Sequence, residues 1–447
     1  MQKHTLNTYL AAMVPLAFSA VASAQTAAQP AAAANYSLES STLKAPASAN
    51  QQISASSYEL SGTSISGATG QTSTILTTPV PTGAAAYKME SGVYLYPTAF
   101  VGFGYNDNVA LTDANRIGSN FVNLAPQLVA ELKHKGDRYT ATASVNRTNY
   151  SNSSGDNATA SQLELAGDNY FDARARMGWA AGLVTGTDAR GANNRPVSNE
   201  ADRWHSSNLN GRFIYGAAEA QGRIEVDAGY RSKIYDNNRI NTAVADVDVT
   251  SLTGRVFYRL GTRTLALAEV RNDNAKYPSA VAVDNNTERR YYLGLTWEAT
   301  AATTGIVKLG RATKDFDRGQ VGYSGSSWEA AVRWLPRSYS MFELQMGRAP
   351  VDSSGVGTYD LNTNTNLTWN HNWTQSLSSA ASIGNTNTSY GGVSRSDSIN
   401  TYSLAVDYSV LRWLKVGVDM SKSNRSSTEA GQNYSRNVTM FTLNASL

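Results

Sequence analysis

Charged residues recur at every second position in several segments of this chain. Arg223, Glu225 and Asp227 alternate with apolar residues, and this spacing places them on one face of a β-strand. A strand with a charged face of mixed sign and an apolar opposite face suits a wall between water and lipid. The residues that we expect to line an aqueous lumen are Arg223, Glu225, Asp227, Arg231, Arg290, Glu298, Glu329, Arg333, Asp360, Asp407, Lys415 and Asp419.

Amide side chains extend this polar face in the segment that follows Asp360. Asn362, Asn364 and Asn366 share its alternation. Rings of one charge select ions, whereas a mixed and amide-rich wall selects little by charge. The pattern therefore favours passage of a neutral or weakly charged hydrophilic solute such as a sugar. The alternative is a filled lumen in which these residues only solvate one another, because polar lumens also occur in plugged barrels.

Residues for catalysis or metal binding are sparse. The chain has four histidines and no cysteine, and His134, His205 and His371 are too far apart to predict a zinc site or a Ser/His pair. Runs such as Asn106–Asn108 resemble calcium ligands, but Asn and Asp are also typical turn residues, which is the interpretation we favour. We therefore predict no enzymatic activity, no metal and no cofactor.

Alternating segments continue to the end of the chain. From Val93 onward about eighteen candidate strands follow one another, joined in turn by short polar connections and longer loops rich in Asn, Asp, Gly and Ser. The count falls to sixteen if the weakly alternating segments 304–315 and 374–388 are not strands. This pattern predicts an all-β fold, a transmembrane antiparallel up-and-down β-barrel with short turns and both termini in the periplasm.

The N-terminal part has a different composition. Met1–Ala24 has an apolar stretch and an Ala-Ser-Ala site typical of a cleaved secretory signal peptide. Residues 25–90 are low in complexity and predicted to be a flexible periplasmic segment, which leaves 91–447 for the barrel. The formal net charge is +3 and no basic stripe is present, so we do not expect nucleic-acid binding.

One segment resembles a known family. Pro97 opens a strand that runs into a Gly-x-Gly-Tyr-x-Asp-Asn-Val element, similar to the first strand of the β-barrel porin family found in exopolysaccharide biosynthesis operons. The matching residues are Gly102, Gly104, Tyr105, Asp107, Asn108 and Val109. Elsewhere the resemblance rests on length and strand rhythm. The chain departs from most outer-membrane barrels by ending on Leu447 rather than an aromatic residue, so recognition by the assembly machinery is expected to lean on Phe441 and Leu443.

The resemblance implies an outer-membrane channel of a Gram-negative bacterium for export of exopolysaccharide or capsular polysaccharide. It implies contact with outer-membrane lipid and lipopolysaccharide, the barrel-assembly machinery, periplasmic polysaccharide-export proteins and the polysaccharide itself. The residues alone leave two alternatives open. One is a general diffusion porin for small hydrophilic solutes, and the other is a structural or adhesive barrel with a blocked lumen.

Overall fold

The computed structural model describes residues 58–60, 63–65, 86–195, 198–217, 219–300 and 303–446. The expected signal peptide, most of the expected periplasmic segment and Leu447 lie outside these residues. Within the described strands, the side chains of 58–60, 63–65 and 298–300 are also outside the description.

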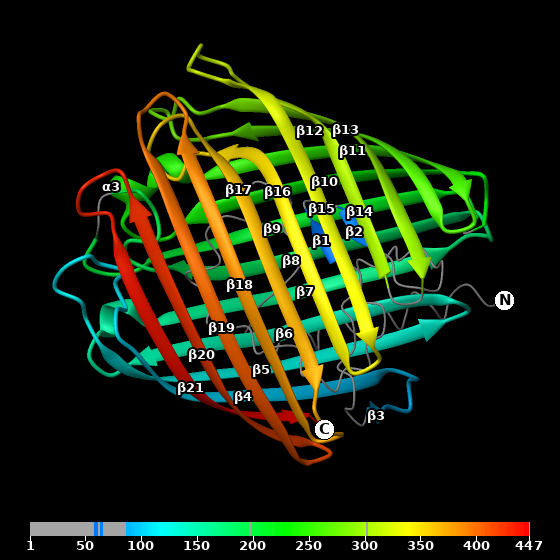
Figure 1. The fold of residues 1–447 in the computed structure, drawn as a ribbon, viewed down its shortest axis with the longest axis horizontal. Helices are drawn as coiled ribbons and strands as arrows, with labels where there is room; N and C mark the ends of the chain where they lie inside the picture. Colours follow the sequence, from blue (N-terminus) through cyan, green and yellow to red (C-terminus); the bar gives the residue numbers. More distant parts are fainter. Residues whose placement is uncertain are drawn as a thin grey trace.

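Eighteen antiparallel strands form a closed barrel (Figure 1). They are β4 (Tyr94–Asn106), β5 (Ser119–His134), β6 (Asp137–Tyr150), β7 (Ala158–Tyr170), β8 (Ala175–Asp188), β9 (Asp202–Tyr215), β10 (Gly222–Tyr235), β11 (Val247–Gly261), β12 (Thr264–Lys276), β13 (Asn286–Thr300), β14 (Thr303–Phe316), β15 (Tyr323–Arg337), β16 (Ser340–Asp352), β17 (Tyr359–Asn372), β18 (Leu377–Tyr390), β19 (Ser396–Leu411), β20 (Leu414–Ser427) and β21 (Tyr434–Ser446). The weakly alternating segments form β14 and β18, so the prediction of eighteen strands is confirmed and sixteen is excluded.

Three short strands lie outside this ring. β3 (Tyr87–Lys88) pairs with the start of β4. β1 (Tyr58–Leu60) and β2 (Thr63–Ile65) form a separate two-stranded sheet, with β1 in contact with β15 and β2 in contact with β14.

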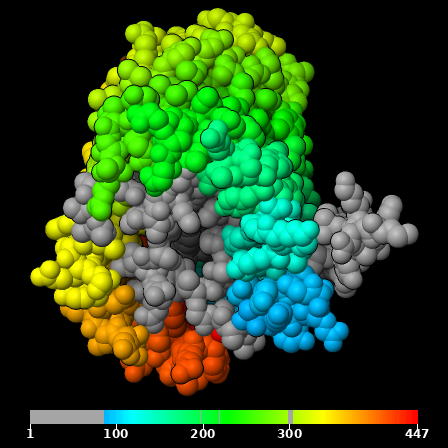
Figure 2. Space-filling view, turned by 90° about the vertical axis from the view of Figure 1, so that its right-hand side faces the viewer, coloured from blue at the N-terminus to red at the C-terminus, as the bar shows by residue number. Residues whose placement is uncertain are grey.

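The barrel closes where the last strand meets the first. β21 pairs with β4 from Val438 opposite Asn106 to Ser446 opposite Thr98. Figure 2 views the end of the barrel and shows the blue first strands beside the orange-red last strands. Closure leaves no edge of unpaired N–H and C=O groups, which is the condition for a sheet to lie in lipid.

Short turns gather at one end of the barrel and long loops at the other (Figure 1). The turn after β5 is a two-residue hairpin, with His134 opposite Asp137. Its central residues, Lys135 and Gly136, have φ of 51° and 96°, as the type I′ turn of a two-residue hairpin requires. Bacterial outer-membrane barrels place their short turns in the periplasm, so we expect the short-turn end to be periplasmic and the long-loop end extracellular.

The long-loop end also carries the helical turns η1 (Ser154–Asp156), α3 (Arg239–Thr242) and η2 (Ala243–Ala245). No helix among the described residues is long and apolar enough to cross a membrane.

The two faces of each strand differ as the alternation predicts. On β13, Leu293 points outward and is 72% exposed, whereas Arg290 points inward and is 1% exposed. Exposed leucine and buried arginine are the reverse of a soluble protein, and they fit a barrel with lipid outside and a polar interior. At 13 to 16 residues, the strands exceed the roughly 9 to 11 needed to span a bilayer, so their ends extend beyond the apolar band.

Two glycines fit the closing seam. On β4, Gly102 and Gly104 face the interior, where Phe100, Phe121 and Met440 form a buried apolar cluster. A Cβ on Gly104 would lie 2.5 Å from Cζ of Phe121, which is closer than packed atoms can approach. The glycines therefore let large side chains from β5 and β21 pack over β4.

Leu367→Arg and Asn364→Arg test the assignment of the two faces of β17. Leu367 is exposed on the outer face near the middle of the strand, and Asn364 is exposed on the inner face. Arginine facing lipid at mid-depth costs about 2–4 kcal/mol. We expect Leu367→Arg to lower the free energy of unfolding in phospholipid vesicles by that amount, and Asn364→Arg to leave it nearly unchanged. Equal effects would contradict the assignment.

Gly104→Ala tests the seam. The added Cβ meets Phe121 and the carbonyl oxygen of Thr439, so we expect a loss of about 1–3 kcal/mol from overpacking. Gly254→Ala in β11 is the matched control, because a Cβ there has no neighbour within 4 Å. The measurement is the temperature at which the folded band is lost in heat-modifiability electrophoresis. No difference between the variants would mean that the seam tolerates a side chain.

Candidate functional site

The interior wall of the barrel is the candidate site. The sequence-predicted residues that face it lie on six strands. They are Arg223, Glu225, Asp227 and Arg231 on β10, Arg290 on β13, Glu329 and Arg333 on β15, Asp360 on β17, Asp407 on β19, and Lys415 and Asp419 on β20. Glu298 lies on β13, in the stretch whose side chains are outside the description. That these residues contact a solute stays a prediction.

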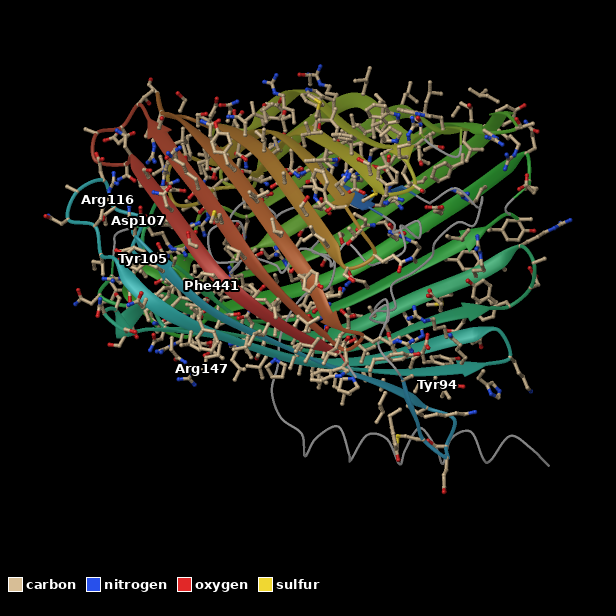
Figure 3. The ribbon with its side chains drawn as sticks, turned by 60° about the horizontal axis from the view of Figure 1, so that its bottom comes forward. Tyr94, Tyr105, Asp107, Arg116, Arg147 and Phe441 are labelled. Carbon is tan, nitrogen blue, oxygen red and sulfur yellow. The ribbon has the colours of Figure 1, made fainter. Side chains whose placement is uncertain are left out.

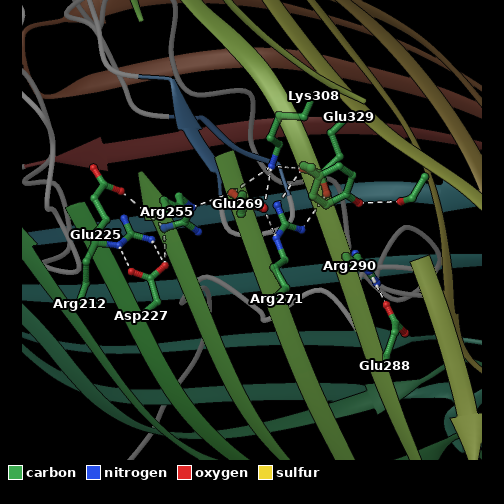
Figure 4. Close-up of polar contacts among 12 residues, drawn as sticks. Arg212, Glu225, Asp227, Arg255, Glu269, Arg271, Glu288, Arg290, Lys308 and Glu329 are labelled. Carbon is green, nitrogen blue, oxygen red and sulfur yellow. Dashed lines mark hydrogen bonds and ion pairs between the residues drawn. The ribbon is translucent and has the colours of Figure 1, made fainter. Parts of the chain in front are cut away.

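A network of ion pairs begins on β9 to β12 (Figure 4). Arg212 donates to both oxygens of Asp227, at 2.8 and 3.0 Å. Arg255 donates to Asp227 at 2.7 Å and to Glu269 at 2.8 Å, and its Nη1 lies 3.5 Å from Glu225. Cations and carboxylates thus alternate across four neighbouring strands.

The network continues to β14 and β15. Arg271 donates to both oxygens of Glu329, at 2.8 and 2.9 Å. Lys308 pairs with Glu329 and also lies 3.3 Å from Glu269. Tyr292 on the intervening β13 contributes its ring, 5.2 Å from the Arg271 guanidinium and 5.0 Å from Lys308 Nζ, within the range of cation–π attraction.

We name these eight charged residues the charge ladder: Arg212, Glu225, Asp227, Arg255, Glu269, Arg271, Lys308 and Glu329. Four are cations and four are carboxylates, and Arg223 adds a further cation 3.0 Å from Glu225, so the charges of the ladder and this neighbour nearly balance. Burying an ion is costly unless a partner and hydrogen bonds compensate. The ladder therefore fixes one side of the interior, and its charges are engaged with one another.

Further ion pairs lie outside the ladder. Toward the extracellular end Arg290 pairs with Glu288 and donates to the Pro350 carbonyl at 3.0 Å. Lys314 on β14 lies 2.8 Å from Asp352 on β16. These contacts hold the extracellular end of β16 close to β13 and β14. Toward the periplasmic end Arg333 pairs with Glu343 at 3.2 Å.

The structure thus unites Glu225, Asp227 and Glu329 in the ladder. Arg223 joins its edge through an ion pair with Glu225 at 3.0 Å, and the other predicted residues that the structure describes lie apart from it. Sequence reasoning missed Arg212, Arg255, Glu269, Arg271 and Lys308. The available signal was opposite charge two positions apart, as in Glu269 and Arg271, because such residues share a strand face. The strand that supplies the partner depends on the register between neighbouring strands, and the sequence of one segment does not contain that register.

The wall formed by β17, β18 and β19 has a different chemistry. Apart from Ile399, its inward positions between the strand ends are amides, hydroxyls and small residues. We name the amides and hydroxyls the amide wall: Asn362, Asn364, Asn366, Ser382, Thr386, Thr388, Thr401 and Ser403. Ser382 and Ser403 share a hydrogen bond of 2.6 Å, and Thr388 donates to Asn362 at 2.6 Å. Charges on these inner faces occur only toward the ends, at Asp360, Asp397 and Asp407.

The residues of the Gly-x-Gly-Tyr-x-Asp-Asn-Val element lie in the barrel seam and in the first long loop. Figure 3 places Tyr94 toward one end of β4 and Tyr105 and Asp107 toward the other. Asp107 accepts hydrogen bonds from the backbone N–H and the side-chain amide of Asn437, at 2.7 and 2.6 Å. Asn108 accepts from the Thr112 backbone N–H at 3.0 Å, and the Val109 N–H donates to Ile117 at 2.9 Å.

These hydrogen bonds to neighbouring backbone groups are typical of turn residues, which is the interpretation that we favour for Asn106–Asn108. Among the residues that the structure describes, no group of three His, Cys, Asp or Glu side chains is arranged to hold a metal ion.

Comparison with known proteins identifies one family. The model of the family described as "Putative beta-barrel porin 2" matches residues 89–447. No curated protein matches the sequence significantly.

Similar solved structures include OccK2 (OpdF) of Pseudomonas aeruginosa, with 10% identity, coverage of 80% of this chain and 98% of that chain, and a TM-score of 0.45. A BenF-like porin from Pseudomonas fluorescens Pf-5 has 9% identity, 81% and 100% coverage, and a TM-score of 0.45. A bacterial polysaccharide outer membrane secretin has 9% identity, 78% and 98% coverage, and a TM-score of 0.35. At such low identities and TM-scores, these likenesses carry no inference about solute or partner.

Glu269→Gln tests whether the charge ladder holds the barrel together. Glu269 neutralises Arg255, Arg271 and Lys308, and breaking such a buried pair costs about 3–5 kcal/mol. We expect a matching loss in the free energy of unfolding, measured by urea titration of tryptophan fluorescence in vesicles. Glu219→Gln is the control, because Glu219 is 84% exposed and lies 3.8 Å from its partner. Equal urea midpoints would show that the ladder contributes little.

Proposed function

The chain belongs to the family described as "Putative beta-barrel porin 2", and from that premise we propose that this porin-like outer-membrane barrel is a channel for export of exopolysaccharide or capsular polysaccharide. In this proposal the barrel does not modify the polymer chemically. Periplasmic partner proteins deliver the polymer to it.

The observation that carries the proposal is the amide wall. A sugar chain exposes hydroxyl groups that both donate and accept hydrogen bonds, and amides and hydroxyls can exchange such bonds with little preference for charge. Asn364 is exposed and Asn366 is half-buried, so both side chains are accessible. The charge ladder on β9 to β15 supports this use of the lumen, because its ions pair with one another and bind a neutral solute weakly.

A general diffusion porin is the second candidate, and the family description as a porin favours it. Such a porin exchanges small solutes without periplasmic partners. It would therefore raise uptake of small sugars in a strain that makes no polymer, whereas an export channel tied to partners would not. A barrel that supports neither uptake nor export would be structural or adhesive, with a blocked lumen.

Deletion of the gene tests the export proposal in cells. We expect polymer synthesis to continue and polymer at the cell surface to be lost, with recovery when the wild-type chain is restored. The measurement is the ratio of cell-surface to periplasmic polysaccharide. Unchanged surface polymer in the deletion strain would contradict export.

Complementation with wall variants tests the site itself. Asn364→Leu/Asn366→Leu removes two inward amides, and Thr363→Leu/Thr365→Leu changes the outward positions of the same strand. We expect the first pair to lower surface polymer several-fold and the second to leave it near the wild-type level, provided both barrels are folded. Equal recovery would remove the amide wall from the proposal.

A further inference from the structure

A loop crosses the extracellular end of the barrel from one wall to the other. It joins β8 to β9, and we name its residues 189–195 the strap. The strap contacts β18, which is ten strands from β8 in one direction around the ring of eighteen. A loop that only connected its own hairpin would bond to adjacent strands, so this reach across the lumen requires a separate explanation.

Asn194 makes the cross-lumen contacts. Its backbone N–H donates to the Ser354 carbonyl at 3.1 Å, and its side-chain amide donates to Ser354 Oγ at 2.6 Å and to Tyr390 Oη at 3.0 Å. Ser354 belongs to the loop between β16 and β17, and Tyr390 ends β18. The strap is therefore tied to the far wall through both backbone and side chain.

The side-chain oxygen of Asn194 completes the attachment. It accepts hydrogen bonds from Nη2 of Arg395 at 2.9 Å and Nη2 of Arg425 at 2.6 Å. Asp397 binds both guanidiniums, at 2.8 and 2.5 Å, and so orients them. An asparagine side chain offers two N–H donors and two lone pairs, and Asn194 uses all four on the opposite wall.

Ion pairs hold the base of the strap near its own strands. Arg190 pairs with Asp156 in the loop after β6, and this hydrogen-bonded pair raises the pKa of Arg190 above its ordinary value. Arg195 lies 3.4 Å from Asp202 and stacks 4.6 Å from the Tyr235 ring. These anchors restrict the strap on one side of the lumen, and the hydrogen bonds described above that tie it to the other side all come from neutral atoms of Asn194.

The strap also packs tightly against the loop between β16 and β17. Gly355 has φ of 120°, and a Cβ there would lie 2.9 Å from Cγ of Arg195. The loop after β16 thus needs glycine to meet the strap. Ala192 of the strap packs with Leu111 and Tyr434 in a small apolar cluster.

We propose that the strap is a latched bar across the extracellular mouth, that Asn194 is its latch, and that the latch sets the size of solute that passes. The bar divides the opening, so a small sugar passes beside it and a polymer passes only after the Asn194 contacts break. This inference rests on the channel function proposed above. Because the latch uses uncharged atoms of the strap, it opens without separating an ion pair.

The experiment exploits the absence of cysteine from the chain. Asn194→Cys/Ser354→Cys places two thiols at the latch, so that reduction frees the strap and oxidation, or a short thiol crosslinker, locks it. The probe is swelling of liposomes that contain the barrel, with neutral maltooligosaccharides of increasing length. We expect the reduced protein to admit longer oligosaccharides than wild type, and the locked protein to exclude them while still admitting the smallest sugars.

Asp107→Cys/Asn437→Cys is the matched control. These residues also share backbone and side-chain hydrogen bonds, but they join adjacent segments without crossing the lumen. Its oxidation is expected to leave the size limit unchanged. Asn194→Ala is a second test that needs no crosslink, and it is expected to raise the size limit in the same direction as reduction.

The outcomes separate the two proposals. Identical size limits for locked, reduced and Asn194→Ala barrels that do conduct would overturn the latch and leave the channel intact. Folded barrels that admit no sugar in any state would overturn the channel itself.

Discussion

Every backbone polar group in the membrane must find a partner within the protein, and this constraint determines the rest of the structure. An alternating chain can meet it only by closing the sheet, which β21 and β4 accomplish. Closure encloses an interior that the alternation makes polar. Buried charges in that interior require partners, and the charge ladder supplies them across neighbouring strands.

The interior is consequently asymmetric. The ladder on β9 to β15 engages its ions with one another, and the amide wall on β17 to β19 presents uncharged groups. The strap crosses above both and meets the far wall at Asn194. A hydrophilic path with little net charge and a restricted extracellular mouth is the combination that a neutral or weakly charged polymer would use.

The extent to which the sequence predicts this arrangement follows from the range of each interaction. Alternation is a local pattern, so the number of strands and the two faces of each strand are predictable from it. The β5–β6 turn is equally local, because it depends on Lys135 and Gly136. The partner of a lumen charge is set by register between strands, so Glu329 can be predicted to face inward but not to bind Arg271. The strap could not be predicted either, because Asn194 meets Arg395 and Arg425 about two hundred residues further along the chain. The family-like glycines were recognised as a motif, and the structure supplies their physical reason in the side chains that pack over them.

The most direct test of the central claim is the ion selectivity of the barrel in a planar bilayer under a salt gradient. A water-filled path along the amide wall, with the ladder neutralised internally, predicts steady conductance and a reversal potential near zero, since neither ion is favoured. A strongly cation- or anion-selective current would show that unpaired charges line the path. A folded barrel without conductance would contradict an open hydrophilic channel.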